Sequence, residues 1–264
     1  MDEKIQPLKR FGQNYIFDKN IIQKIIDEFN PQSEDLVLEI GPGRGALTSE
    51  LIGKTKKFIA VEIDKRIVKK LAEKFPELEI INEDFLKIKL ESFVESNNKL
   101  RIIGNIPYNI TSPILFKLID ERKFVSDALL MVQYEVAKRI IAKEGTKDYS
   151  LLSVLLNFFA QTEFCFKISP NVFYPKPKVY SALIKIRFYD SLQEDVDEKL
   201  FISVVKAAFG NRRKTLKNSL SNSIFRTIIS RSSSDSISHL LSKRAEDLSI
   251  KDFVELYKYI EKNL

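Results

Sequence analysis

The chain has 264 residues and very little of the residue types on which several classes of site depend: one cysteine, one histidine and no tryptophan. A single cysteine cannot form an intramolecular disulfide, and one Cys with one His falls short of the four ligands of a structural zinc site. One histidine also gives little basis for a nucleophile activated by a histidine base. We therefore expect a reducing compartment and metal-independent chemistry, with His239 and Cys165 in structural roles.

Long hydrophobic runs are missing as well. No stretch approaches the roughly 18 uninterrupted apolar residues that a membrane span needs, and the first residues have no apolar core of a secretory signal. We expect a cytoplasmic protein with no membrane contact. Because 44% of the residues are hydrophobic and 30% are charged, the composition favours a folded chain over a disordered one.

Positive charge is the one bias that suggests a partner. The net charge of +7 fits a polyanion such as nucleic acid, although it fits generic solubility as well. Residues 206–231 contain no acid and seven bases: Lys206, Arg212, Arg213, Lys214, Lys217, Arg226 and Arg231. We expect this interval to bind phosphates without reading base sequence. A solvated helix face is the alternative interpretation.

Apolar runs alternate with helical segments through most of the chain. Five runs have the length of strands: residues 36–40, 58–63, 78–81, 101–104 and 128–132. Helical spacing marks residues 46–53, 65–75, 135–142 and 149–159. This alternation predicts a mostly parallel sheet with helices on both faces, and the later β-rich runs 163–168 and 179–188 predict an antiparallel edge hairpin. Helical spacing without strands then predicts a small helical domain at residues 190–264, after a first domain at 1–189.

Special residues stand at the carboxyl ends of these predicted strands, where the ligands of such sheets gather. Gly41, Gly43 and Gly45 follow the first strand and either let the backbone pass close to a ligand or simply make a tight turn. Their GxGxG spacing does not separate a nicotinamide cofactor from another adenosine-containing one. Glu62 ends the next strand, where a carboxylate can accept hydrogen bonds from ribose hydroxyls. Asp84 ends the third, where it can bond an adenine amine.

The segment Asn105-Ile106-Pro107-Tyr108 ends the fourth strand. Pro107 drives Ile106 out of the helical region, so the Ile106 carbonyl and the Asn105 side-chain oxygen can converge on one donor. Two acceptors on the hydrogens of an adenine N6 amine favour the pyramidal, nucleophilic geometry of that nitrogen. Tyr108 can stack on the target base, although a core role fits it equally well, and Phe173 could cover the other face of the base.

Together, the segments EIGPGRG, VEID, EDF and GNIPYN resemble the S-adenosylmethionine-dependent adenine-N6 methyltransferases that act on RNA. The stretches LKRFGQNYIFD, MVQYEVAKRI, YSLLSV and FYPKPKVYSALIKI are similar to those of the ribosomal RNA adenine dimethylases. The C-terminal AAFGNRRKTLKNSL resembles the small-subunit dimethyladenosine transferases, the kasugamycin-sensitivity family. RRKTLKN and YSLLSV favour that family over the erythromycin-resistance methylases, which modify large-subunit ribosomal RNA.

The resemblance implies a Rossmann-like class I methyltransferase sheet with a C-terminal RNA-binding helical domain. It implies S-adenosylmethionine as the cofactor, S-adenosylhomocysteine as the product and no metal. The residues that it implies for the cofactor are Asn14, Ile16, Gly41, Gly43, Glu62, Ile63, Asp84, Phe85 and Asn105. Its implied substrate is a pair of adjacent adenosines, each dimethylated, in a hairpin near the 3′ end of small-subunit ribosomal RNA. The expected partner is an immature small ribosomal subunit. The protein itself is expected to be a monomer with a role in the biogenesis of that subunit.

Two positions depart from the usual pattern of the family. Tyr15-Ile16 stands where Phe-Leu is common, and Tyr180 replaces a frequent Asp. Two other functions stay open at this point. The chain could act chiefly as an assembly factor that occupies the immature subunit. The intact segment 105–108 argues against this, because it keeps catalysis possible. It could also be a DNA adenine methylase, although the roughly 75 residues after the hairpin leave no room for the usual large target-recognition domain.

Overall fold

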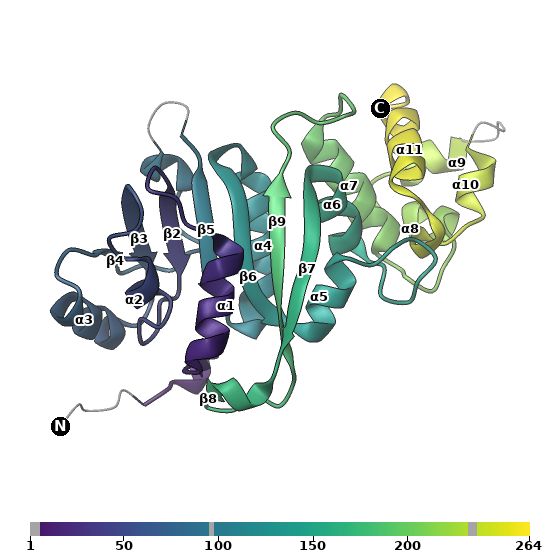
Figure 1. Cartoon of the computed structure of the whole chain (residues 1–264). Helices are drawn as coiled ribbons and strands as arrows, with labels where there is room; N and C mark the ends of the chain where they lie inside the picture. Colours follow the sequence, from purple (N-terminus) through teal and green to yellow (C-terminus); the bar gives the residue numbers. More distant parts are fainter. Residues whose placement is uncertain (1–5, 95–97, 232–236) are drawn as a thin grey trace. The chain divides into compact units, whose positions relative to one another are not determined.

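Seven strands form the central sheet of the computed structural model, which describes residues 6–94, 98–231 and 237–264 (Figure 1). In spatial order they are β4 (Glu79–Ile81), β3 (Lys57–Val61), β2 (Leu36–Ile40), β5 (Leu100–Asn105), β6 (Val125–Gln133), β9 (Ser181–Phe188) and β7 (Ala160–Ile168). The first five strands pair in parallel, and β9 runs antiparallel to β6. The prediction of a mostly parallel sheet with an antiparallel edge is confirmed.

The register of the central strands brings their carboxyl ends level. Ile40 at the end of β2 lies opposite Val61 of β3 on one side and Gly104 of β5 on the other. Val37 and Leu38 of β2 are fully buried because helices cover both faces of the sheet. The glycine turn, Glu62 and Asn105 therefore leave the sheet side by side.

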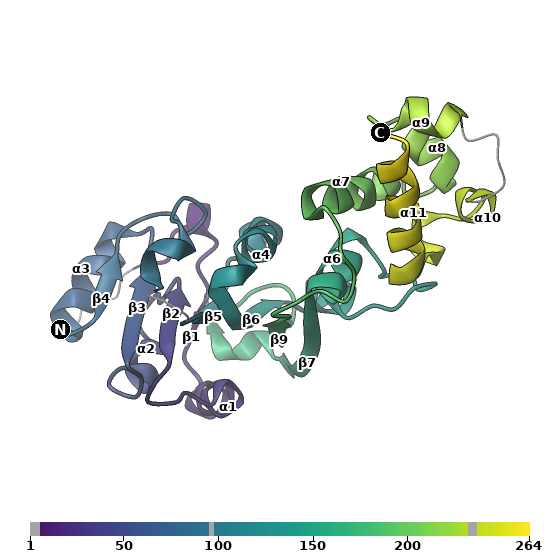
Figure 2. The same cartoon turned by 90° about the horizontal axis from the view of Figure 1, so that it is seen from above.

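Helices pack on both faces of this sheet (Figure 2). On one face, α1 (Lys19–Phe29), α2 (Thr48–Leu51) and α3 (Lys65–Lys74) contribute to a single buried cluster with alternate strand residues. On the other face lies α4 (Thr111–Asp120). Asp18 caps α1 by accepting hydrogen bonds from the backbone of Asn20 and Ile21. The predicted helix 46–53 contains only the four residues of α2.

A second, two-stranded sheet ties the N-terminal segment to the loop before β9. Its strands β1 (Tyr15–Ile16) and β8 (Phe173–Tyr174) are antiparallel, with Tyr15 opposite Tyr174 and Ile16 opposite Phe173. Strands of two residues leave no alternating pattern in a sequence, and neither was predicted. Their pairing places the segment that contains Asn14 against the glycine turn.

The chain divides into two units, one made of Met1–Ala137 with Thr162–Phe188 and one made of Lys138–Gln161 with Tyr189–Leu264. The second, helical unit takes in residues 138–161, which precede the boundary drawn at residue 190. Its helices are α6 (Leu151–Phe159), α7 (Glu198–Phe209), α8 (Leu216–Ser221), α9 (Arg226–Arg231), α10 (Ser238–Leu241) and α11 (Ile250–Lys262), and α5 (Tyr134–Ile140) runs from the first unit into it.

Aromatic side chains hold the helical unit together. Phe201 of α7 stacks on Phe158 of α6 with 4.1 Å between ring centroids, and it meets Tyr257 of α11 edge-on. This core explains the helical spacing of apolar residues along α7, because the side chains at the spaced positions are all buried in it: Phe201, Val204, Val205 and Ala208. Across the described ranges, no helix combines the length and the hydropathy that crossing a membrane requires.

Candidate active site

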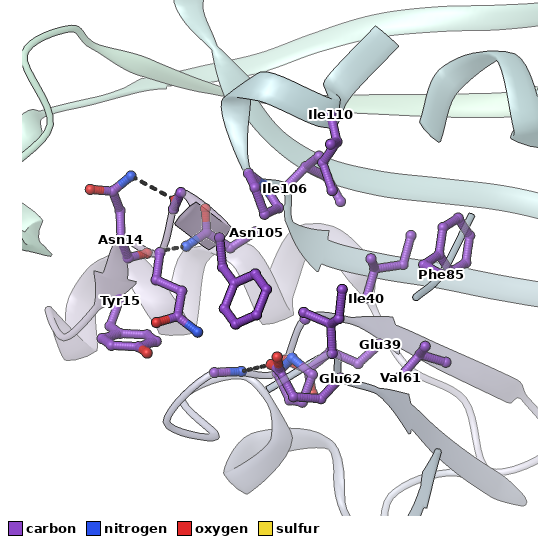
Figure 3. Close-up of a pocket in the computed structure, with 18 of the residues that line it drawn as sticks. Asn14, Tyr15, Glu39, Ile40, Val61, Glu62, Phe85, Asn105, Ile106 and Ile110 are labelled. Atoms are coloured by element: carbon purple, nitrogen blue, oxygen red, sulfur yellow. Dashed lines mark hydrogen bonds between the residues drawn. The ribbon is translucent and has the colours of Figure 1, made fainter. Parts of the chain in front are cut away.

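A cavity opens at the level carboxyl ends of β2, β3 and β5 (Figure 3). Its lining includes every cofactor or catalytic residue predicted from the sequence except Phe173: Asn14, Ile16, Gly41, Gly43, Glu62, Ile63, Asp84, Phe85, Asn105, Ile106, Pro107 and Tyr108. These residues come from segments up to 94 positions apart, counted from Asn14 to Tyr108. The sheet register therefore gathers them at one site.

The glycine turn packs against the Tyr15 ring at Gly43 and borders open space at Gly41. Gly41 and Gly43 have φ values of +65° and +56°, a region that side-chain-bearing residues rarely adopt. A Cβ on Gly43 would lie 2.8 Å from Cδ1 of Tyr15, whereas a Cβ on Gly41 would meet nothing within 4 Å. The backbone at Gly41 therefore borders open space in the cavity.

Glu62 directly follows β3, and its carboxylate holds the glycine turn by hydrogen bonding. Its Oε2 accepts a hydrogen bond from the Gly43 amide (3.3 Å), and its Oε1 accepts one from the Asp64 amide (2.9 Å). Burial raises the pKa of Glu62, and these amide bonds oppose the rise. Each carboxylate oxygen keeps a further lone pair for a hydroxyl donor.

Asp64 caps α3 beside this carboxylate. Hydrogen bonds from Arg66 lower the pKa of Asp64 to about 2, and Gln13 donates a further bond to it at 3.2 Å. Gln13 also lines the cavity. The hydrogen bond from Gln13 to Asp64 therefore anchors the N-terminal segment to the start of α3.

Asn105 joins the strand-end motif to the same N-terminal segment. Its Nδ2 donates a hydrogen bond of 2.6 Å to the backbone carbonyl of Asn14 (Figure 3). The side chain of Asn14 in turn donates to the Gly12 carbonyl at 3.2 Å. With its amide nitrogen engaged, Asn105 has Oδ1 as its acceptor for a donor in the cavity.

The residues after Asn105 differ in the use of their carbonyls. The Pro107 carbonyl accepts from the Ile110 amide (3.1 Å) and from the Thr111 hydroxyl (3.3 Å). The Ile106 amide donates to Met131, which fixes the peptide at that point. Since the Pro107 carbonyl is taken, the Ile106 carbonyl is the better candidate for a second acceptor beside Asn105.

Tyr108 is held by a hydroxyl that the sequence reasoning missed. Its phenol oxygen lies 2.7 Å from Oγ of Ser181, and Ser181 is 1% exposed. Burial raises the pKa of Tyr108, so the phenol stays neutral at ordinary pH. Phe173 is 3% exposed in β8 and does not line the cavity among the described residues. Its place over a target base stays a prediction.

Two further cavity residues carry perturbed groups. Burial raises the pKa of Glu39 to about 8, and Thr48 donates a 2.6 Å hydrogen bond to it. Tyr15 is 7% exposed, and its hydroxyl has no hydrogen-bond partner within the described chain. Burial, followed by the charges of Glu62 and Asp64, raises the pKa of Tyr15 to about 12. The acid in the apolar run LVLEI was the signal that could have identified Glu39.

The basic residues of the interval 206–231 differ in the contacts that they make. Arg212 donates to the Tyr149 carbonyl (3.0 Å) and to the carbonyl of Lys147, and it pairs with Glu246 at 3.2 Å. Arg213, Lys214 and Lys217 are exposed, as are Lys206 and Arg226. In the described ranges, no group of three or more His, Cys, Asp and Glu side chains could hold a metal ion.

Comparison with known proteins gives a family that covers almost the whole chain. The profile of the family "Ribosomal RNA adenine dimethylase" matches residues 6–262. A "Ribosomal RNA small subunit methyltransferase A" of Caldanaerobacter subterraneus subsp. tengcongensis is 44% identical over 255 residues, 94% of this chain and 95% of that protein. The protein of the same name from Francisella tularensis subsp. novicida is 39% identical over 264 residues, 98% of this chain and 100% of its own.

Two solved structures resemble the chain along its length. A dimethyladenosine transferase from Plasmodium falciparum has a TM-score of 0.76 and 28% identity, over 94% of this chain and 98% of its own. The 23S rRNA methyltransferase ErmE has a TM-score of 0.67 and 25% identity, over 94% of this chain and 99% of its own. Sequence and fold thus point to the same group of proteins.

Proposed function

The chain belongs to the ribosomal RNA adenine dimethylase family, and we propose that it transfers methyl groups from S-adenosylmethionine to N6 of adenosines in small-subunit ribosomal RNA. It is an enzyme with the class I methyltransferase fold and acts as a ribosomal RNA adenine dimethyltransferase. The observation that carries the proposal for the site is the position of Asn105 and Tyr108 on a cavity bounded by Gly41, Glu62 and Asp84.

The cavity has the chemistry that a nucleoside cofactor requires. Open space beside Gly41 admits a ligand close to the backbone, and Glu62 can accept hydrogen bonds from two ribose hydroxyls. Asp84 can accept from an adenine amine, while Ile63 and Phe85 supply apolar contacts. Asn14 and Ile16 close the site from the N-terminal side. When bound there, S-adenosylmethionine supplies a sulfonium methyl group that is already activated toward nitrogen.

The chain's residues align the target amine and hold its hydrogens. Oδ1 of Asn105 and the carbonyl of Ile106 accept from the N6 hydrogens of adenine, which shifts the nitrogen lone pair away from the ring. Tyr108, fixed by Ser181, stacks on the base. After methyl transfer the adenine N6 nitrogen would be cationic and strongly acidic, so it can release its proton to water and the site needs no strong base. The chain's one histidine, His239, lies in the helical unit on α10. Preorganised acceptors and alignment therefore carry the catalysis.

The similarity of the chain to known proteins supports small-subunit ribosomal RNA as its substrate. The curated relatives at 44% and 39% identity are small-subunit methyltransferases, whereas the large-subunit enzyme ErmE is 25% identical. The exposed bases of the helical unit would bind the phosphates of this RNA. The proposal extends to two adjacent adenosines, each dimethylated, in a hairpin near the 3′ end within an immature small subunit. It also takes the enzyme to be a metal-free, cytoplasmic monomer with a role in subunit biogenesis.

A substrate comparison tests the proposal. Purified protein and labelled S-adenosylmethionine are incubated separately with immature small subunits, large-subunit ribosomal RNA and duplex DNA, and the nucleosides are then identified by digestion and mass spectrometry. We expect N6,N6-dimethyladenosine in the small-subunit RNA. Label in large-subunit RNA alone, or in DNA alone, would overturn the proposed substrate. Tight binding to the immature subunit with no transfer would instead assign the chain a role in assembly.

A further inference from the structure

A lysine held between two tyrosine rings lies on the surface of the sheet-containing unit. The Lys167 ammonium is 3.9 Å from the centroid of the Tyr180 ring and 4.7 Å from that of Tyr134. Within the described chain, Lys167 forms no ion pair with a carboxylate. Tyr180 is 47% exposed. The two rings therefore position the Lys167 ammonium at the surface without neutralising its charge.

This cluster of Tyr134, Lys167 and Tyr180 adjoins the active site through the backbone. The Tyr134 amide donates to the Tyr180 carbonyl at 2.9 Å, where β6 ends and β9 begins. The residue after Tyr180 is Ser181, whose hydroxyl lies 2.7 Å from that of Tyr108. A nucleic-acid strand with a base at Tyr108 would therefore have this cluster close to it.

The chain around the cluster carries one sign of charge. Residues 164–189 contain no acid and five bases: Lys167, Lys176, Lys178, Lys185 and Arg187. Lys185 pairs with Glu28 and Arg187 pairs with Glu163, so acids from other segments offset these two. Lys176 and Lys178 are exposed in the segment between Tyr174 and Tyr180, two tyrosines that are about half exposed. The free charge thus lies beside exposed rings.

We propose that the cluster binds single-stranded RNA next to the target adenosine, with one base stacked on Tyr180 and the adjoining phosphate at Lys167. This inference rests on the proposed function, which supplies the RNA. Aromatic rings interleaved with cations are the usual surface for single-stranded nucleic acid, because every base has a face that can stack. An acidic protein would use the cations but would leave the exposed face of Tyr180 without a role.

Four variants separate stacking from charge. Tyr180→Ala removes the ring, Tyr180→Phe keeps it, and Lys167→Ala removes the cation. Lys69→Ala is the matched control, since Lys69 is an exposed lysine on α3, at the opposite edge of the sheet. Filter binding of radiolabelled, protein-free small-subunit ribosomal RNA is measured over a range of salt concentrations. Thermal unfolding and calorimetric titration with S-adenosylmethionine show whether each variant is folded and binds cofactor.

Each substitution has its own expected signature. Tyr180→Ala weakens RNA binding between about fivefold and a hundredfold, with little change in salt dependence, and Tyr180→Phe stays within about twofold of the unsubstituted protein. Lys167→Ala lowers the slope of log K against log salt by about 0.7, the value for one phosphate contact on a single strand. Lys69→Ala and the cofactor titrations show no change.

Two results would count against the cluster as an RNA site, and a third would count against stacking on Tyr180. If Tyr180→Ala and Lys167→Ala bind RNA as the unsubstituted protein does, the inference is wrong even when methyl transfer to ribosomal RNA is normal. If both variants bind free RNA normally but bind assembled subunits weakly, the cluster docks on a ribosomal protein instead. If Tyr180→Phe is as weak as Tyr180→Ala, stacking is not the interaction. Should the unsubstituted protein methylate no RNA, the proposed function fails, and the binding measurement still decides the inference.

Discussion

The side-chain amide of Asn105 donates a hydrogen bond to the backbone carbonyl of Asn14, 91 residues earlier in the chain. This 2.6 Å contact connects the motif that would hold the target amine to the segment that would close over the cofactor. It also orients the Asn105 side chain, because only one of its two polar ends can face the Asn14 carbonyl. The acceptor end, Oδ1, is thereby left for the target amine in the proposed reaction.

Asn105→Asp tests whether this orientation matters. Aspartate keeps an acceptor of the same shape but loses the donor, and its charge would repel the Asn14 carbonyl. We expect Asn105→Asp and Asn105→Ala each to lower kcat by roughly a hundredfold or more, the usual effect of removing a preorganised hydrogen bond. Single-turnover methyl transfer at saturating cofactor makes the measurement. An aspartate variant with normal turnover would show that the bond to Asn14 has no catalytic role.

The two glycines of the turn should respond differently to alanine. At Gly43 the new Cβ would lie 2.8 Å from the Tyr15 ring, whereas at Gly41 it would enter open space in the cavity. Both variants carry the strain of a positive φ, about 1–2 kcal/mol. Gly43→Ala should therefore show the larger loss of thermal stability, and Gly41→Ala should chiefly weaken S-adenosylmethionine binding in calorimetry. Equal melting temperatures for the two variants would contradict this assignment.

The sequence predicted the sheet and most of the cavity because both follow from local patterns. Apolar runs gave the strands, and the rule that ligands gather at strand ends identified Glu62 and Asp84 as facing one site. What could not be predicted depends on contacts between distant segments. The pairing of β1 with β8 joins two-residue strands, and it buries Phe173 against the N-terminal segment. Likewise, the sequence revealed the charge of Arg212 but not the carbonyls that it bonds.

Glu39 should make stability depend on pH. Burial raises the pKa of Glu39 to about 8 in the folded chain, against 4.5 for an unperturbed carboxyl. Between these values the folded state keeps a proton that the unfolded state has released, so the free energy of unfolding falls as pH rises from about 4.5 to about 8. Glu39→Gln resembles the protonated form and should flatten this decline in urea unfolding. Glu77→Gln, an exposed acid, is the control, and the idea fails if both variants keep the full decline.

Lys214 and Arg212 should differ although they are neighbours in the basic interval. Lys214 is exposed, so Lys214→Gln should weaken binding to ribosomal RNA and lower the salt slope by about 0.7–0.9 without loss of stability. Arg212 is exposed as well, but it bonds the Tyr149 carbonyl and pairs with Glu246 of the same helical unit. Arg212→Gln should therefore lower the melting temperature as well. RNA binding and thermal unfolding of both variants decide the matter, and two equally stable proteins would count against a structural role for Arg212.

Ser181 should act on the reaction through Tyr108. The two hydroxyls lie 2.7 Å apart, and Ser181 is buried, so Ser181→Ala leaves the Tyr108 hydroxyl without this partner and frees the ring to turn. We expect a several-fold fall in kcat with little change in the KM for S-adenosylmethionine, because the ring would contact the target base and not the cofactor.

A double-mutant cycle separates this positioning role from simple packing. Tyr108→Phe keeps the stacking ring but removes the hydroxyl, so a further Ser181→Ala substitution has no hydrogen bond left to break. The effects of the two substitutions on kcat should therefore be far from additive. Ser181→Thr, which keeps a hydroxyl, should recover much of the lost activity if the buried site admits its extra methyl group. Strictly additive effects would mean that Ser181 supports the fold but does not orient Tyr108.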